Sequence, residues 1–281
     1  MSTELSLTRI SDQDARQFLQ GQLTNDVNAL RLSWQFTGYC SVKGRLIMTG
    51  ILLDSGEDLF LLCHPTVQET VISTLSKYRL RSKVSFTPVA ATFQLVPGEA
   101  NEHSNHNVTL SQAGVLQLDL GNATLVVTIT PNDAGPTASD SDAFDAQWRH
   151  WRVSNGICII DAALQEKYVP QMINLDQIDG INFKKGCYTG QEIVARMHYL
   201  GKLKQRLVKL IEPESHKQAV QQGNSVIAFV GDEALQIGDI VATDPSHRQH
   251  LAVVRLEHSD QPLASANDLS EPFSIEPLPY G

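Results

Sequence analysis

Residues 182–206 read NFKKGCYTGQEIVARMHYLGKLKQR, and their charge sets them apart from the rest of the chain. They hold six Lys and Arg residues and one acidic residue, a local balance of +5. The whole chain of 281 residues carries a formal net charge of −9, which leaves −14 for the remainder. An acidic protein that concentrates its positive charge in one segment is expected to bind an anionic ligand there.

A helix is expected inside this segment. Thr189 and Glu192 have the T-x-x-E spacing of a capping box, in which the Thr hydroxyl and the Glu carboxylate satisfy backbone N–H groups at a helix start. This spacing predicts an N-cap at Thr189 and a helix from Gly190 toward His198.

Cys187 lies two residues before that cap and allows two interpretations. Helix N-terminal amides and the adjacent Lys184 and Lys185 favour a thiolate, and Gly186 and Gly190 allow the backbone to approach a ligand closely. Cys187 is then a reactive or cluster-ligating thiol beside an anion site. Alternatively, it is a small buried side chain at a helix start, flanked by solvated lysines.

The rest of the chain has the composition of a globular protein with two or three domains. Hydrophobic residues make up 42% and charged residues 19%, and no run of 18 apolar residues is present. The first 15 residues do not have the pattern of a signal peptide. The four cysteines form no C-x-x-C pair, which favours a reducing compartment. We therefore expect a cytoplasmic protein with no membrane contact.

Local patterns predict helices and strands up to about residue 160 and strands alone after Leu203. Helices are expected from Ser11 with Asp14 as capping partner, after Pro65, and over Ala143–Asn155. Strands are expected over Gln35–Leu53 around a turn at Lys43-Gly44, over Val84–Leu95, in a hairpin at 115–129, and over Ile157–Ile160. Residues 131–142 are the best linker candidate. After Leu203, short apolar runs between turn residues predict a small all-β barrel or sandwich.

Other candidate site residues are less informative. Trp148 either stacks on an aromatic ligand or fills the core, and Asp161 either binds a ligand or caps a turn. His150 and His198 lack carboxylate or Cys partners at the spacing of metal ligands, so no metal site is expected.

Lys185 to Glu192, KGCYTGQE, resembles the K-G-C-Y-x-G-Q-E signature of the YgfZ family. These are folate-binding proteins of tRNA modification and iron–sulfur maintenance, related to the glycine-cleavage T-protein. Three further segments resemble family motifs: FLQGQLTNDV at 18–27, YCSVKGR at 39–45 and IEPLPY at 275–280.

The resemblance implies an α+β fold in which two ferredoxin-like α+β domains and a C-terminal small β-barrel form a ring. The expected domains are a discontinuous folate-binding domain at 1–45 and 141–200, an inserted domain at 46–140, and the barrel at 201–281.

The resemblance also implies a tetrahydrofolate site in the centre of the ring, lined by Cys187 as the functional thiol. Of two tryptophans assigned to folate in the bacterial members, one matches Trp148 and the other aligns with Leu5. The implied folate-binding residues are Trp148, Lys184, Lys185, Gly186, Tyr188, Gly190, Gln191, Glu192 and Arg196.

Three functions follow from the resemblance. The first is a folate-binding accessory protein that supports iron–sulfur client enzymes such as radical tRNA methylthiotransferases. The second is a folate-dependent aminomethyl-type transferase, but the place of the T-protein's catalytic Asp falls at Met48-Thr49, so the acid or base is missing. The third, direct tRNA binding, is disfavoured by the net charge of −9.

Overall fold

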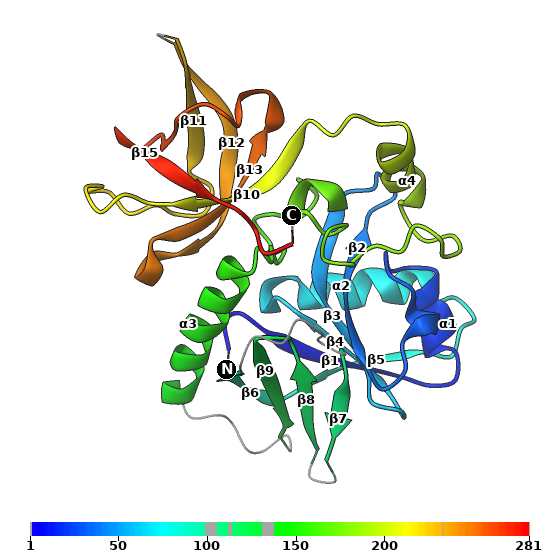
Figure 1. The fold of residues 1–281 in the computed structure, drawn as a ribbon. Helices are drawn as coiled ribbons and strands as arrows, with labels where there is room; N and C mark the ends of the chain where they lie inside the picture. The colour runs from blue at the N-terminus through cyan, green and yellow to red at the C-terminus, as the bar shows by residue number, and fades with distance from the viewer. Residues whose placement is uncertain (1, 99–105, 112–113, 131–137, 232, 281) are drawn as a thin grey trace.

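The computed structural model describes residues 2–98, 106–111, 114–130, 138–231 and 233–280. Two antiparallel sheets are followed by a segment that contains helices and then by a closed β-barrel at the C-terminal end of the chain (Figure 1). The expected α+β class and the C-terminal barrel are therefore confirmed.

The first sheet contains a strand that is buried along its whole length. Every one of the nine residues of β3 (Leu46–Asp54) is buried. Met48 and Leu52 pack on the side of the helices, whereas Ile51 and Leu53 belong to the core shared with the second sheet. The strand order is β2 (Trp34–Cys40), β3, β4 (Leu59–Cys63), β1 (Ser6–Ser11) and β5 (Ser85–Val89), accompanied by α1 (Ala15–Gln20), η1 (Val27–Ala29) and α2 (Pro65–Tyr78).

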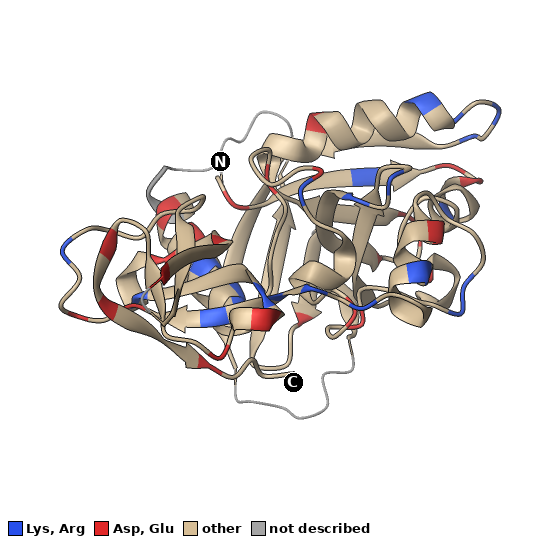
Figure 2. Cartoon of the chain, turned by 90° about the horizontal axis from the view of Figure 1, so that it is seen from above, with Lys and Arg blue, Asp and Glu red and all other residues tan. Residues whose placement is uncertain are grey.

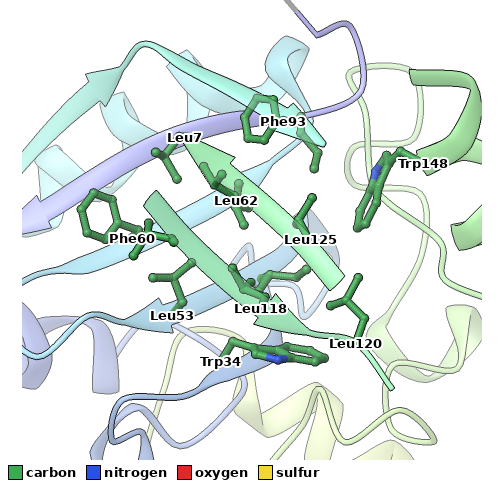
Figure 3. Close-up of a cluster of buried hydrophobic side chains, with 14 of the residues drawn as sticks. Leu7, Trp34, Leu53, Phe60, Leu62, Phe93, Leu118, Leu120, Leu125 and Trp148 are labelled. Atoms are coloured by element: carbon green, nitrogen blue, oxygen red, sulfur yellow. The ribbon is translucent and has the colours of Figure 1, made fainter. Parts of the chain in front are cut away.

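The second sheet packs against the first across a common hydrophobic core. Figure 3 shows Leu7, Leu53 and Leu62 of the first sheet facing Leu118 and Leu125 of the second. Its strand order is β6 (Ala91–Pro97), β9 (Ala123–Ile129), β8 (Val115–Asp119) and β7 (Val108–Leu110). The hairpin expected at 115–129 corresponds to β8 and β9, which pair antiparallel.

The segment after the second sheet contains α3 (Ala138–Ser154), η2 (Pro170–Ile173) and α4 (Gln191–Tyr199). The strand expected over Ile157–Ile160 is wrong in one respect: the residues are buried, but they pair with no strand within the described chain. Thr49 holds them instead. Its Oγ1 donates to the Cys158 carbonyl oxygen at 3.0 Å and accepts from the Ile160 N–H at 2.9 Å.

The C-terminal barrel is closed because β15 returns to pair with β10. Its interior is a separate hydrophobic cluster that includes Leu210, Val226, Ile240 and Phe273. The strand order is β10 (Gln205–Ile211), β13 (Gln249–Arg255), β12 (Glu233–Asp244), β11 (Ser225–Val230), β14 (Leu263–Ser265) and β15 (Asp268–Glu276), with η3 (Pro245–His247) and η4 (Leu256–His258) between strands.

Two expected local features differ from the structure. Ser11 ends β1 rather than capping a helix, and α1 starts at Ala15 after Asp14, whose side chain makes no cap bond. The Asp14 carboxylate accepts instead from the Lys83 N–H at 2.7 Å, a contact between segments distant in sequence. The strand expected over Val84–Leu95 is divided at residue 90, and its two halves lie in different sheets.

The domain boundary expected at 45/46 lies within the first sheet. The boundary expected at 45/46 falls between β2 and β3, which pair along most of their length, so it does not coincide with a division between sheets. The sheets divide instead at residue 90. Residues 131–137 of the expected linker lie outside the described residues, and the rest of it belongs to α3, which begins at Ala138 rather than Ala143. In the described parts of the chain, no helix is long and apolar enough to cross a bilayer.

Candidate functional site at Cys187

Three segments that carry family-like motifs meet beside Cys187. The Thr189 N–H donates to the Gly21 carbonyl oxygen at 3.3 Å, and the Asn182 N–H donates to the Thr24 carbonyl oxygen at 3.0 Å. These bonds join the 182–190 loop to the 18–27 segment. The turn at 41–44, which connects β2 and β3, packs against the start of α4. Segments distant in sequence therefore form one site (Figure 1).

Side chains of the 18–27 segment form hydrogen bonds both with β2 and with the loop that leads to Cys187. The Thr24 hydroxyl donates to the Gly180 carbonyl oxygen and accepts from the Gly38 N–H, both at 2.7 Å. The Asn25 Nδ2 donates to the carbonyl oxygens of Phe36 and Asp179 at 2.8 and 2.6 Å. Each buried side chain thus binds the sheet on one side and the loop on the other.

Lys185 is a structural anchor of the site. Its Nζ donates to the carbonyl oxygens of Leu23 and Asn25, both at 2.7 Å, and lies 5.2 Å from the centre of the Tyr188 ring. Only 9% of the residue is exposed. Burial lowers the pKa of its ammonium to about 8, although the nearby Asp26 carboxylate acts in the opposite direction. The Lys185 side chain is therefore directed into the protein, whereas Lys184 is exposed.

Gly190 and Gly44 allow the helix start and the 41–44 turn to touch. Both have positive φ, +81° and +68°. A Cβ on Gly190 would lie 2.5 Å from the Ser41 carbonyl oxygen, and a Cβ on Gly44 would lie 2.7 Å from the Ile193 Cβ, distances that real Cβ atoms essentially never show. Glycine is therefore required at both positions for this packing.

The capping box expected at Thr189 is wrong. Gly190 is the N-cap of α4, in the left-handed conformation and with no side-chain cap bond. The Thr189 hydroxyl instead donates to the Gln22 Oε1 at 3.1 Å. The close contact at Gly190 moves the helix start by one residue, so Thr189 ties the loop to the 18–27 segment.

Of the four cysteines, all within the described residues, only Cys187 is exposed. Burial raises the pKa of Cys40 and Cys158 to about 12 and that of Cys63 to about 11, which keeps these three thiols protonated at neutral pH. Gly186, next to Cys187, is exposed, and a Cβ placed there would have no atom within 4 Å. The structure thus contradicts the interpretation of Cys187 as a buried helix-start side chain.

The exposed positive charge of residues 182–206 is smaller than the sequence suggests. Arg206 makes a two-pronged ion pair with Asp176 at 2.8 and 3.0 Å, and Lys185 is anchored as described. The other four cations are exposed and make no side-chain hydrogen bond or ion pair with any described residue: Lys184, Arg196, Lys202 and Lys204. Glu192 is also exposed, one turn before Arg196 on α4, and Gln191 is half-buried. An anion bound at this segment would therefore meet four exposed cations and the exposed carboxylate of Glu192, rather than all six cations.

Trp148 lies apart from this site, in the core that the two sheets share. It is fully buried and stacks on Trp151, with ring centres 5.0 Å apart, and on Phe144 at 6.2 Å. In the view of Figure 1, α3, which carries Trp148, and α4 lie on opposite sides of β2 and β3. The structure therefore does not place Trp148 in a common pocket with the Cys187 loop.

Trp148 and Leu5 line a narrow cavity beside the central strand β3. Its water-accessible volume is about 10 Å³, which is room for about one water molecule. The walls are apolar apart from Thr49, whose hydroxyl is already bonded to the 158–160 segment. The Trp148 Nε1 is buried without a partner in the described chain. A pterin ring needs far more space and several polar partners, so the residues of this narrow cavity do not fit a folate.

Sequence patterns missed two features. The Lys185 anchor looked like an ordinary member of a basic segment, and only its place in the motif singled it out. His150, for which no ligand partner was expected, lies against Asp244 and His247. The D-x-x-H spacing of Asp244 and His247 was the available signal, but the sequence does not show that α3 packs on the barrel at this point.

Known proteins whose sequences are similar to this chain include several tRNA-modifying YgfZ proteins. No family model matches the chain. It is 31% identical to the tRNA-modifying protein YgfZ of Aliivibrio fischeri, over 86% of this chain and 80% of the relative. The YgfZ proteins of Colwellia psychrerythraea and Sodalis glossinidius are 30% and 27% identical, over 85% and 98% of this chain and 79% and 90% of the relatives.

A solved structure shares the fold. The glycine cleavage system aminomethyltransferase T from Bartonella henselae superimposes with a TM-score of 0.73 over 99% of this chain and 84% of that chain. The sequences are 13% identical, so this likeness concerns the fold alone.

Proposed function

Because this chain belongs to the YgfZ family of tRNA-modifying proteins, we propose that it supports tRNA modification through the exposed thiol of Cys187. It acts as an accessory protein of iron–sulfur enzymes such as radical tRNA methylthiotransferases. The observation that carries this proposal is the convergence of three motif segments on a loop that presents Cys187 to solvent.

Cys187 has the access that a contact with a client requires. The loop is held in place by hydrogen bonds from the side chains of Lys185, Thr24 and Asn25. Gly186, which has no side chain, leaves the space beside the thiol open. A thiol on such a loop can reach a cluster or a cysteine of a second protein, which the three buried thiols cannot do. In this proposal Cys187 performs a thiol-dependent step or a transient cluster contact.

Folate is the ligand that the resemblance and the aminomethyltransferase-like fold suggest for the molecule's centre. The narrow cavity at Trp148 does not fit it, so folate would bind there only if the walls moved apart. The proposed role of Cys187 does not depend on folate. Titration with tetrahydrofolate under anaerobic reducing conditions, followed by tryptophan fluorescence, tests this part separately.

An aminomethyl-type transferase is the alternative function, but the residues that line the cavity at Trp148 offer it no acid or base. Met48 is fully buried, and the Thr49 hydroxyl is occupied by backbone groups. No Asp or Glu is among the residues that line the cavity. The contribution of a positioned proton-transfer group, about 10²–10⁴-fold, is thus missing.

Direct tRNA binding is also not the function we propose. In the view of Figure 2, Lys and Arg are scattered over the chain and interspersed with acidic residues, rather than aligned in one stripe. The net charge of −9 acts against phosphate binding over most of the surface. The protein is therefore expected to act on tRNA through client enzymes.

The test of the proposed function is genetic rescue. The chain is expressed in a bacterium deleted for its own YgfZ protein, and methylthiolated nucleosides are measured in bulk tRNA against an empty-vector control. We expect restoration to the level given by the host's own protein. Unchanged nucleosides, with the chain present at comparable abundance, would contradict the proposal.

A further inference from the structure

A second cluster of functional side chains lies where α3 packs against the barrel. The His150 Nδ1 lies 2.7 Å and the His247 Nδ1 2.8 Å from the same oxygen of Asp244, Oδ2. The two imidazole rings are 3.7 Å apart between centres. One nitrogen or oxygen atom from each of the three residues lies within 4.8 Å of the others. The three side chains therefore point at one small volume.

The spacing matches a metal site after a small adjustment. Zinc binds imidazole nitrogen and carboxylate oxygen at about 2.0–2.2 Å in tetrahedral geometry, which places neighbouring ligand atoms about 3.3 Å apart. Nitrogen–oxygen distances of 2.7 and 2.8 Å need to open by only about half an ångström. Exposed side chains can make such a movement by small rotations.

The ligand types select the class of metal. Two imidazoles and one carboxylate suit Zn²⁺ and similar divalent transition metals, whereas Ca²⁺ and Mg²⁺ prefer sites made of oxygen atoms. Two histidines and one carboxylate are also the three-ligand pattern that leaves a fourth position open to water or a substrate.

The surroundings hold the ligands in place and leave the site accessible. The Asp244 side chain is 4% exposed, whereas those of His150 and His247 are 41% and 50% exposed. Asp244 ends β12 and is the N-cap of η3, and it pairs with Gln249 of β13, so its position is set by the barrel. A hydrogen bond of 3.0 Å from Ser154 to Gln249 joins α3 to the barrel beside the cluster. Water can reach the exposed faces of the two rings.

We propose that His150, Asp244 and His247 bind one divalent transition-metal ion, Zn²⁺ in the first instance. The ion links α3 to the barrel and keeps an open coordination position facing solvent. This site is independent of the role proposed for Cys187, since it uses other residues on other elements.

The test is a zinc titration of the tag-free chain after treatment with a chelator. We expect one Zn²⁺ per chain by calorimetry and in competition with a chromogenic chelator. His247→Asn and Asp244→Asn should weaken binding at least tenfold. His198→Asn, which removes an exposed histidine stacked on Phe183, is the matched control and should bind like the unaltered chain.

Cobalt provides a second readout that does not depend on affinity. Co²⁺ bound to the unaltered chain should give the visible absorption bands of a tetrahedral site, and these bands should be absent from a His247→Asn variant with a native circular dichroism spectrum. Equal zinc binding by that variant and the unaltered chain would overturn the proposal, because it would place the ion elsewhere. Absence of stoichiometric binding would also overturn it and leave a metal-free His–Asp–His cluster.

Discussion

The Cys187 loop and the cavity at Trp148 differ in the contacts that hold them and in how open they are to solvent, although the resemblance assigns both to one ligand site. The loop is held by polar contacts that reach across the fold, such as the Lys185 ammonium on two carbonyl oxygens, and it leaves a thiol open to solvent. The cavity between Leu5 and Trp148 has almost no polar lining and is nearly filled by its own walls. Directional contacts can support an open site, whereas apolar walls without polar groups pack together.

The largest expected effect concerns the glycine contact that fixes the loop. Gly190→Ala places a Cβ 2.5 Å from the Ser41 carbonyl oxygen at a φ of +81°, so the backbone must shift. We expect the free energy of unfolding to fall by about 2–5 kcal/mol in urea titration. Gly186→Ala, in open space and without positive φ, is the matched control, and we expect a change below about 1 kcal/mol. Equal effects of the two would contradict the contact.

Loss of the buried ammonium should be the next largest effect. Lys185→Met leaves the carbonyl oxygens of Leu23 and Asn25 without their donor inside the protein. We expect a loss of about 2–3 kcal/mol in the free energy of unfolding, and Lys184→Met, at an exposed position, should change it by no more than about 0.5 kcal/mol. Similar losses in the two variants would show that Lys185 is not an anchor.

The buried thiols predict a dependence of stability on pH. Burial raises the pKa of Cys40, Cys63 and Cys158 from 9.0 to between about 11 and about 12 in the folded state. Above pH 9 the unfolded chain therefore loses these protons first, and the stability that is fully present below pH 9 is lost as the pH rises toward 11. Lys185, with its pKa lowered to about 8, contributes the opposite slope, but it is one group against three.

Urea unfolding at a series of pH values between 9 and 10.5 measures this slope. We expect the free energy of unfolding to decrease across the range, with a shallower decrease in Cys63→Ala. Cys187→Ser, which removes the exposed thiol, should keep the slope of the unaltered chain. A shallower decrease in Cys187→Ser than in Cys63→Ala would mean that the burial of these two thiols has been assigned the wrong way round.

The smallest expected effect is that of folate on the cavity at Trp148. Because the cavity has room for only about one water molecule, tetrahydrofolate should cause no saturable quenching of tryptophan fluorescence. Saturable quenching with one binding site would instead show that Leu5 and Trp148 move apart in solution, and it would join the two regions into one functional centre.

Elements whose side chains follow a simple period could be predicted from the sequence. The helix after Pro65 was expected from the spacing of Val67, Val71, Leu75 and Tyr78. The first three residues form its buried face, whereas Tyr78 is exposed. The alternation of short apolar runs after Leu203 predicted a small all-β barrel or sandwich, because strands and turns leave a local signal, and the structure has the barrel. The motif at 185–192 identified the family, which the relatives confirm.

Features that depend on contacts between distant segments could not be predicted. The start of α4 is set by the approach of Gly190 to Ser41, which overrides the local capping box at Thr189. Residues 157–160 look like a strand, but the Thr49 hydroxyl bonds the Cys158 carbonyl oxygen and the Ile160 N–H in place of a neighbouring strand. Which of the lysines at 184 and 185 is buried depends on carbonyl groups about 160 residues earlier in the chain.

The most direct measurement of the central claim is the amount of methylthiolated tRNA in the rescue strain when the chain carries Cys187→Ala. Cys63→Ala, which removes a buried thiol, is the matched control. With both variants present at the abundance of the unaltered chain, we predict that Cys187→Ala gives the level of the strain without the protein and that Cys63→Ala gives full rescue. Full rescue by Cys187→Ala would contradict the claim that the exposed thiol carries the function.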